Sequence, residues 1–142
     1  MKKHISFNGD IIESFDSNLY TNRAFKFGDG VFESIRILNG KPLFLDHHIN
    51  RLIAGANAMK IEVSPKISES SIRKIFAELC HINNINESGR ARLTFFRAGE
   101  GAYQPTTNEG SYVIEMIPIE KNSFDLNSEG LIVDTFKLMQ KS

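Results

Sequence analysis

Two stretches in the middle of the chain repeat apolar residues every three or four positions, which is the spacing of an amphipathic helix. Asp46 and Ser68 precede these stretches, and both residue types accept hydrogen bonds from the free N–H groups of a first helical turn. The pattern therefore predicts one helix from Asp46 to about Lys60 and a second helix after Ser68. The apolar stripes are Ile49, Leu52, Ile53, Ala56 and Met59 in the first helix and Ile72, Ile75, Phe76, Leu79 and Ile82 in the second.

Runs of β-branched and aromatic residues before and after the helices predict strands. His4–Phe7 and Asp10–Glu13 are joined by Asn8-Gly9, a strong hairpin signal because both residues tolerate positive φ. Strands, then two helices, then strands again predict an α+β domain with a mainly antiparallel sheet. After a second Asn-Gly hairpin at Asn39-Gly40, the remaining strands are expected at Leu43–Leu45, Ala91–Phe96, Tyr112–Ile119 and Leu131–Phe136.

The segment Gly28–Arg36 differs from an ordinary core strand. Two glycines flank Asp29 in an expected turn, and a strand-like run follows at once. Successive side chains of a strand point to opposite faces, so the run has two distinct faces. An aromatic residue and an arginine share one face, which indicates the wall of a site. The faces are Val31, Glu33 and Ile35 on one side and Phe32, Ser34 and Arg36 on the other.

Composition narrows the classes of function. The 142 residues are expected to form one domain, and 41% apolar with 24% charged residues are typical of a globular protein. Seventeen basic and seventeen acidic residues balance, and the basic residues are scattered, so no nucleic-acid partner is predicted. No apolar run approaches a span of about 20 residues, so no membrane partner is predicted. The single cysteine, Cys80, excludes an internal disulfide and is typical of a reducing cytoplasm, the predicted location.

Arg51 is the candidate anion-binding residue of the first helix. It lies about 200° from Ile49 around the helix, on a face shared with His47 and Gly55. Two interpretations fit this position. Arg51 is either an exposed surface residue or a guanidinium that binds a phosphate through paired hydrogen bonds.

A second group of arginines lies on the strand Ala91–Phe96. Arg90, Arg92 and Thr94 share one face of this strand, so Arg92 points away from Phe95 and need not enter the core. The arginines form either a solvated sheet edge or a site for a carboxylate. Arg97 is a further cation at the end of the strand.

Metal and nucleophile chemistry have no support in the sequence. Cys80 is expected to be a buried packing residue. No serine lies in a G-x-S-x-G context, and no catalytic residue is predicted. No metal site is predicted either, because zinc-ligand spacing is absent from His4, His47, His48 and His81.

Four motifs occur in the order and spacing of one known family. They are Phe27–Arg36, Asn39–Pro42, His48–Leu52 and Arg92–Arg97. Together they resemble the class IV aminotransferases, the pyridoxal-phosphate enzymes of fold type IV. That family includes branched-chain and D-amino-acid aminotransferases and aminodeoxychorismate lyase. The resemblance implies that residues 1–142 are the small N-terminal domain of a two-domain enzyme whose C-terminal cofactor domain is absent from this chain.

The resemblance also implies roles for individual residues. Arg51 matches the arginine that binds the phosphate of pyridoxal phosphate, and Arg92 matches a position that helps to bind a substrate carboxylate. Phe27 and Phe32 match aromatic positions that wall the substrate pocket. Tyr103 lies in the Gly99–Gly110 loop, which in family dimers reaches the neighbouring subunit's site. The implied substrates are an amino acid and a 2-oxo acid, and the implied assembly is a homodimer.

Substrate choice is left open by Phe27. Aminotransferases of the family usually have tyrosine at this position, whereas phenylalanine resembles the lyase branch. By contrast, Val31–Arg36 is closer to the aminotransferase form. The expected function is an aminotransferase for branched-chain or related amino acids. The alternatives are aminodeoxychorismate lyase and a non-catalytic interaction module with the same fold.

The family's cofactor-binding lysine is expected beyond Ser142. Lys137 and Lys141 precede its position in the register and are interpreted as ordinary strand-end lysines. The 142 residues alone are therefore expected to be inactive.

Overall fold

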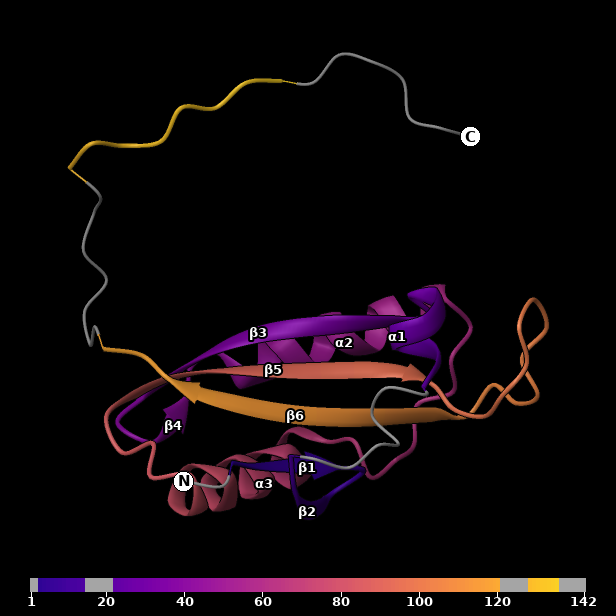
Figure 1. The fold of residues 1–142 in the computed structure, drawn as a ribbon, viewed down its shortest axis with the longest axis horizontal. Coiled ribbons are helices and arrows are strands. Elements are labelled where there is room, and N and C mark those ends of the chain that lie inside the picture. The colour runs from indigo at the N-terminus through magenta and orange to yellow at the C-terminus, as the bar shows by residue number, and fades with distance from the viewer. Residues whose placement is uncertain (1–2, 15–21, 121–127, 136–142) are drawn as a thin grey trace.

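The computed structural model describes residues 3–14, 22–120 and 128–135. Its strands form one six-stranded sheet in the order β2-β1-β6-β5-β3-β4, and neighbouring strands pair antiparallel (Figure 1). The predicted α+β fold with a mainly antiparallel sheet is confirmed. The strands are β1 (His4–Phe7), β2 (Asp10–Glu13), β3 (Gly30–Leu38), β4 (Lys41–Pro42), β5 (Ser88–Arg97) and β6 (Gly110–Pro118).

The described residues contain three helices, α1 (Arg23–Phe27), α2 (Leu45–Ala58) and α3 (Glu69–Ile82). α2 and α3 pack on one face of the sheet, which we call the inner face. The core between them contains side chains of β3, β5 and β6 together with the apolar stripes predicted for the two helices, except Ile82. Its fully buried members include Ile35, Leu93, Phe95 and Ile114 of the sheet and Leu52, Ala56, Ile72 and Phe76 of the helices.

The start of α3 is confirmed and the start of α2 is not. Ser68 forms a capping box with Ser71. By contrast, Phe44 precedes α2 in the left-handed conformation at φ 50° and makes no side-chain cap hydrogen bond. The predicted strand Leu43–Leu45 is wrong, because β4 ends at Pro42 and Phe44 turns the chain directly into the helix. Asp46 accordingly lies in the first turn of α2 rather than at its N-cap.

The helix α1 was not predicted, because five residues are too few to show a 3.6-residue period. Asn22 caps it by accepting a hydrogen bond of 2.9 Å from the Phe25 N–H. Gly28 ends it in the left-handed conformation at φ 64°. Phe27 consequently lies at the end of α1, whereas the strand begins at Gly30.

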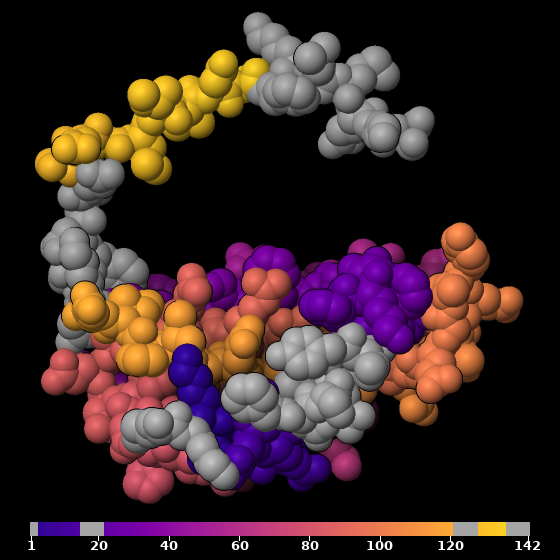
Figure 2. Space-filling model, in the orientation of Figure 1, coloured from indigo at the N-terminus to yellow at the C-terminus, as the bar shows by residue number. Residues whose placement is uncertain are grey.

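The segment 128–135 is extended and stands away from the rest of the molecule (Figure 2). The predicted strand Leu131–Phe136 is wrong for Leu131–Thr135, which join no strand, and Phe136 lies outside the described residues. Lys137 and Lys141 also lie outside the described residues. Within the described parts of the chain, no helix has the length and apolar character needed to cross a bilayer.

Candidate functional site

The sheet face opposite α2 and α3, which we call the outer face, presents alternate residues of β3, β5 and β6. The registers of the β3–β5 and β5–β6 pairs align these residues in rows that run across the sheet. Two neighbouring rows combine an aromatic ring, hydroxyls and opposite charges. These rows are Phe32, Thr94 and Val113, and next to it Ser34, Arg92 and Glu115.

Arg92 and Phe32, two of the predicted substrate-binding residues, are in contact. The guanidinium carbon of Arg92 lies 3.7 Å from the centroid of the Phe32 ring, a cation–π distance. The Nε of Arg92 donates to Oγ1 of Thr94 at 3.4 Å. The ring and the hydroxyl together hold the guanidinium over the outer face, where Phe32 is 54% exposed.

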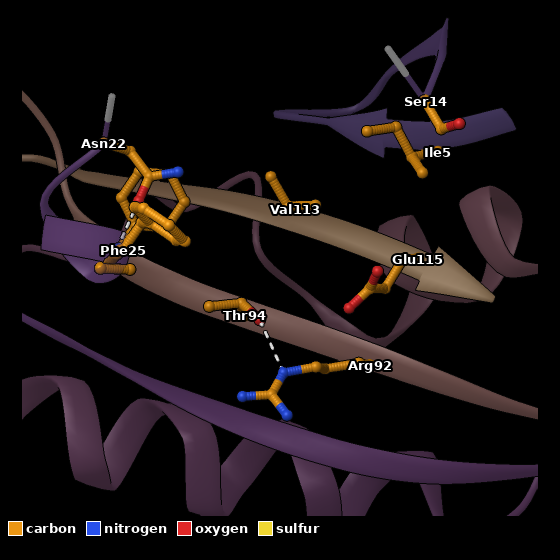
Figure 3. A pocket seen from close by; sticks show the side chains of 10 residues that line it. Ile5, Ser14, Asn22, Phe25, Arg92, Thr94, Val113 and Glu115 are labelled. Carbon is orange, nitrogen blue, oxygen red and sulfur yellow. Dashed lines mark hydrogen bonds between the residues drawn. The ribbon is translucent and has the colours of Figure 1, made fainter. Parts of the chain in front are cut away.

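Two pockets of the outer face share Arg92 and Glu115, and we call them together the Arg92 groove. In the first pocket, Arg92, Thr94 and Glu115 project from the same side of β5 and β6 (Figure 3). The apolar lining of this pocket includes Ile5, Phe25, Phe96 and Val113. The second pocket is more polar and is lined by Phe32, Ser34, Arg90, Arg92, Glu115 and Ile117.

Arg51 lies at the other face of β3, where it binds a buried carboxylate. Its Nε donates to Oε1 of Glu33 at 2.7 Å, and its Nη2 donates to Oε2 of the same group. Nδ1 of His48 lies 2.7 Å from Glu33 Oε2. The Arg51 side chain is 70% exposed and that of Glu33 only 6%. The acid therefore fixes the guanidinium plane while leaving much of the arginine open to solvent.

The close packing of α2 on β3 explains this contact. A Cβ on Gly55 would lie 3.1 Å from Cγ1 of Val31, so α2 approaches β3 closely at this position. Arg51 is one helical turn before Gly55, and Glu33 is two residues after Val31 on the same face of β3. The glycine thus brings the arginine within reach of the carboxylate.

Glu33 is ionised at neutral pH. Burial would raise the pKa of its carboxyl, but hydrogen bonds and charge from Arg51 and His48 outweigh burial and hold the pKa below its ordinary value of 4.5. The hydrogen bond and charge of Glu33 in turn raise the pKa of Arg51. The pair is therefore a stable anion–cation pair at physiological pH.

A second ionic network joins α1, β5 and the loop after β5. Oδ2 of Asp29 accepts from Nε of Arg23 at 2.7 Å and from Nε of Arg97 at 3.1 Å. Both arginines are buried, with 6% and 8% of their surface exposed. Burial would raise the pKa of Asp29, but these two partners outweigh it and hold the pKa below 3.8. Arg97 also donates to the carbonyls of Lys60 and Met59.

The loop that carries Tyr103 is attached to the domain through Arg23. The Arg23 guanidinium donates to the carbonyls of Glu100 and Ala102 at 3.3 and 3.4 Å and also to that of Gly101. Tyr103 itself is fully exposed at the tip of this loop. Figure 1 shows the loop between β5 and β6 extending beyond the end of the sheet.

The structure brings only some of the predicted residues together. Phe32 and Arg92 meet in the Arg92 groove, and Arg51 is bound through Glu33 on the opposite side of β3. The guanidinium carbon of Arg23 lies 5.0 Å from the centroid of the Phe27 ring. Phe27 also lines a separate pocket beside the loop that carries Tyr103.

Several contacts of the two ionic networks were not predicted from the sequence. One of them involves His48, whose side chain is only 16% exposed, whereas that of the adjacent His47 is 77% exposed. The available signal was strand alternation, which puts Glu33 on the apolar face of β3 and Arg97 on the apolar face of β5. A charge on such a face needs a partner. The remaining missed members of the networks are Arg23 and Asp29.

Comparison with known proteins places this geometry in context. The family model for amino-transferase class IV matches residues 30–140. A D-alanine aminotransferase from Bacillus licheniformis is 37% identical over 86 residues, which are 60% of this chain and 30% of that protein. The aminodeoxychorismate lyase of Bacillus subtilis is 28% identical over 130 residues, 89% of this chain and 44% of that protein. The chain therefore spans less than half the length of these relatives.

A solved structure has the same fold. The branched-chain aminotransferase of Thermoproteus uzoniensis, determined with norvaline, superposes with a TM-score of 0.72 at 19% identity. The superposition covers 85% of this chain and 42% of that chain. At this identity the likeness establishes the fold of the domain.

Proposed function

Because this chain belongs to the class IV aminotransferase family, we propose that it supplies the small-domain half of a pyridoxal-phosphate-dependent aminotransferase site. The observation that carries the proposal is the pair of oriented guanidiniums beside β3, Arg51 on one face and Arg92 on the other. An aminotransferase needs a site for the cofactor phosphate and a site for the substrate carboxylate. The proposal assigns the phosphate to Arg51 and the carboxylate to Arg92.

The surroundings of Arg51 fit a phosphate. The two hydrogen bonds to Glu33 use the Nε and Nη2 of Arg51, so the remaining N–H groups of an exposed guanidinium are available to phosphate oxygens. When bound, pyridoxal phosphate supplies the aldehyde that takes up the amino group and a conjugated ring that delocalises electrons. This chain contributes Arg51, which binds the phosphate, and Glu33 with His48 orients the Arg51 guanidinium.

The surroundings of Arg92 fit a substrate carboxylate. Phe32 stacks under the guanidinium and Thr94 accepts from its Nε, so the Nη groups can face a planar anion in the groove. The apolar lining of the first pocket of the groove, which includes Phe25 and Val113, offers a surface for a substrate side chain. Arg92 and Phe32 therefore bind and orient the substrate, while the proton-transferring lysine belongs to a part of the protein outside residues 1–142.

The proposed substrates are an amino acid and a 2-oxo acid, handled by a cytoplasmic homodimer. Relatives named D-alanine aminotransferase make D-alanine the first donor to test. The branched-chain assignment has support from fold neighbours, so branched-chain L-amino acids are the second donors to test. The exposure of Tyr103 at a loop tip supports a contact with the second subunit.

Aminodeoxychorismate lyase is the second candidate function. Its support is the alignment with the Bacillus subtilis lyase, which extends over 130 residues, and phenylalanine at position 27. This enzyme class shares the cofactor but releases pyruvate. A non-catalytic module with this fold is the third candidate, and it requires no lysine downstream.

The test compares this chain with a longer protein that contains it. We expect a lysine within ~20 residues after Ser142 and a second domain of ~100–200 residues. The longer protein should transfer the amino group of D-alanine or a branched-chain amino acid to a 2-oxo acid. Pyruvate release from aminodeoxychorismate without amino transfer would instead establish the lyase.

The control is the 142-residue chain mixed with pyridoxal phosphate and borohydride. We expect no stoichiometric reduction product on Lys137 or Lys141. A stoichiometric product on either lysine, together with amino transfer by the short chain, would overturn the assignment of a half-site.

A further inference from the structure

An open pocket lies between the β1–β2 turn and the start of α3, outside both surfaces that the proposed function uses. We call it the Tyr112 pocket. It shares no lining residue with the two pockets of the Arg92 groove, and none of its lining residues contacts Arg51. Its lining includes Gly9, Lys66, Ser70, Lys74 and Tyr112.

Tyr112 brings a hydroxyl without a partner to this pocket. Its ring belongs to the core, and only 7% of the residue is exposed. A Cβ on Gly9 would lie 3.4 Å from the hydroxyl oxygen, so the hydroxyl lies beside the β1–β2 turn. Among the residues that the structure describes, none makes a hydrogen bond with it. A buried tyrosine hydroxyl usually has a partner, and phenylalanine would fill the core without needing one. The hydroxyl is therefore available to a ligand.

This hydroxyl is a donor at neutral pH. Burial raises the pKa of Tyr112 above its ordinary value of 10, and the negative charge of Asp10 raises it further. Asp10 itself is exposed and lies outside the lining of the pocket. A protonated phenol donates one hydrogen bond and carries no charge, so it suits an anionic oxygen.

Two lysines make the pocket electropositive. The described residues of the lining contain the ammonium groups of Lys66 and Lys74 and no carboxylate. Both lysines are exposed, and neither forms an ion pair with any residue that the structure describes. The acidic residue in the first turn of α3, Glu69, pairs with Arg73. The two lysine charges are therefore free to attract an anion.

The first turn of α3 adds backbone donors. The Ser68 hydroxyl accepts from the Ser71 N–H at 3.2 Å. The N–H groups of Glu69 and Ser70 come earlier in the turn, where a helix offers no carbonyl partner, and they make no hydrogen bond within the described parts of the chain. α3 has 14 residues, and the N-terminus of such a helix favours negative charge.

We propose that the Tyr112 pocket binds the phosphate group of a small molecule. The charges of Lys66 and Lys74 match a phosphate, which carries about −1.5 to −2 at neutral pH. The Tyr112 hydroxyl and the Ser70 N–H donate to its oxygens. The donors come from a strand, a helix start and a preceding loop, an arrangement that suits the several oxygens of a tetrahedral group. The site is separate from the phosphate position proposed for Arg51 and does not depend on it.

Binding to the 142-residue chain tests the proposal without cofactor or turnover. Inorganic phosphate and glycerol 3-phosphate are titrated separately at pH 7 and constant ionic strength, while the backbone amide signals of Gly9, Ser70 and Tyr112 are followed by NMR. We expect saturable shifts of these signals. Tighter binding of glycerol 3-phosphate would identify the ligand as a phosphate monoester. Equal or tighter binding of inorganic phosphate would identify it as free phosphate.

Tyr112→Phe removes only the hydroxyl. It should bind phosphate about five- to tenfold more weakly, because a hydrogen bond to a charged acceptor is lost. Tyr103→Phe is the matched control, since it removes a fully exposed hydroxyl in the loop after β5 and should leave the affinity unchanged.

Lys74→Gln provides a second measurement, on the exposed surface of α3, should Tyr112→Phe fail to fold. It should weaken binding about five- to tenfold. Lys41→Gln, at an exposed lysine of β4, is its control and should have no effect. The dispersion of the amide signals shows whether each variant is folded.

Arg51→Gln separates this pocket from the proposed cofactor site. It should remove any phosphate-dependent shifts of Glu33 and His48 and keep those of Ser70 and Tyr112. Loss of the shifts at Ser70 and Tyr112 in this variant would overturn the proposal. So would equal shifts with chloride at the same concentration, or an unchanged affinity in a folded Tyr112→Phe or Lys74→Gln variant.

Discussion

The carboxylate of Glu33 accepts a hydrogen bond of 2.7 Å from Nε of Arg51 and thereby joins β3 to α2 across a sequence separation of 18. The same carboxylate holds His48 at 2.7 Å. Glu33 is buried while Arg51 is largely exposed, so the acid is the fixed support of the pair and leaves the arginine open to solvent, where the proposed function assigns it to the cofactor phosphate.

Glu33→Gln is expected to change the pH dependence of stability. The pKa of Glu33 in the folded protein is below 4.5, so its stabilising contribution is complete above that pH and is lost as pH falls through the lowered value. At pH 7 the variant should be less stable by about 1–2 kcal/mol, and the difference should shrink below pH 4.5. Urea unfolding at a series of pH values measures this difference.

Glu78→Gln is the control, because Glu78 lies on the exposed face of α3. It should change the free energy of unfolding by less than about 0.5 kcal/mol. Parallel stability curves for the unsubstituted chain and Glu33→Gln across the acid range would contradict the prediction.

Asp29→Asn is expected to loosen the Tyr103 loop as well as destabilise the domain. The substitution leaves the buried Arg23 and Arg97 without their shared carboxylate, at a cost of about 3 kcal/mol. Because Arg23 also holds the carbonyls of Glu100 and Ala102, cleavage after Tyr103 by chymotrypsin should become faster. Asp46→Asn removes an exposed carboxylate and should leave the cleavage rate unchanged, and equal rates in both variants would refute the coupling.

Gly30→Ala should be more damaging than Gly28→Ala. A Cβ on Gly30 would lie 2.6 Å from the Phe95 carbonyl oxygen and 2.8 Å from the Phe96 Cβ, so the β3–β5 pair must shift at a cost of about 2–3 kcal/mol. Gly28 has φ +64° with nothing near its added Cβ, so alanine there costs about 1 kcal/mol of backbone strain. Thermal unfolding of the two variants measures both costs, and the reverse order would contradict this assignment.

Phe32→Leu is expected to weaken carboxylate binding at Arg92 without unfolding the sheet. The ring is 54% exposed and lies 3.7 Å from the guanidinium carbon, so its loss removes about 0.5–1 kcal/mol of cation–π attraction. When butyrate is titrated into the 142-residue chain and binding is followed by NMR, the affinity of the variant for butyrate should be about two- to fivefold lower. Phe44→Leu, at a ring exposed at the start of α2, should leave the affinity unchanged.

Long periodic elements could be predicted from the sequence because their signal extends over several turns or strand pairs. The stripe of α3 and its Ser68 cap, the β1–β2 hairpin and the two faces of β3 are confirmed. α1 has five residues, so its only local signals were the caps Asn22 and Gly28. The strand expected at Leu131–Thr135 was inferred from β-branched residues alone, and those residues have no partner strand within the described part of the chain.

The residue types of the candidate site could be predicted from the sequence, but most of the contacts between them could not. Alternation placed Arg92 and Phe32 on one face of neighbouring strands, but only the register shows that they meet. The partner of Arg51 depends on how closely α2 approaches β3, which is a property of tertiary packing at Gly55. Arg97 was identified only as a cation at the end of the strand. Its place on the core face of β5 required an acidic partner, and Asp29 supplies it from 68 positions away.

The alternation of β3 has a consequence for insertions and deletions. Odd-numbered Glu33 supports Arg51, and even-numbered Phe32 and Ser34 line the groove, so β3 contributes residues to both of the proposed binding surfaces. A single residue inserted after Gly30 would exchange these assignments, sending the acid into the groove and the ring toward α2. An insertion of two residues would restore both. Insertions or deletions of two residues in this strand should therefore be tolerated better than those of one residue. Substitutions at Phe32 or Ser34 change the lining of the groove without removing the contact between Glu33 and Arg51.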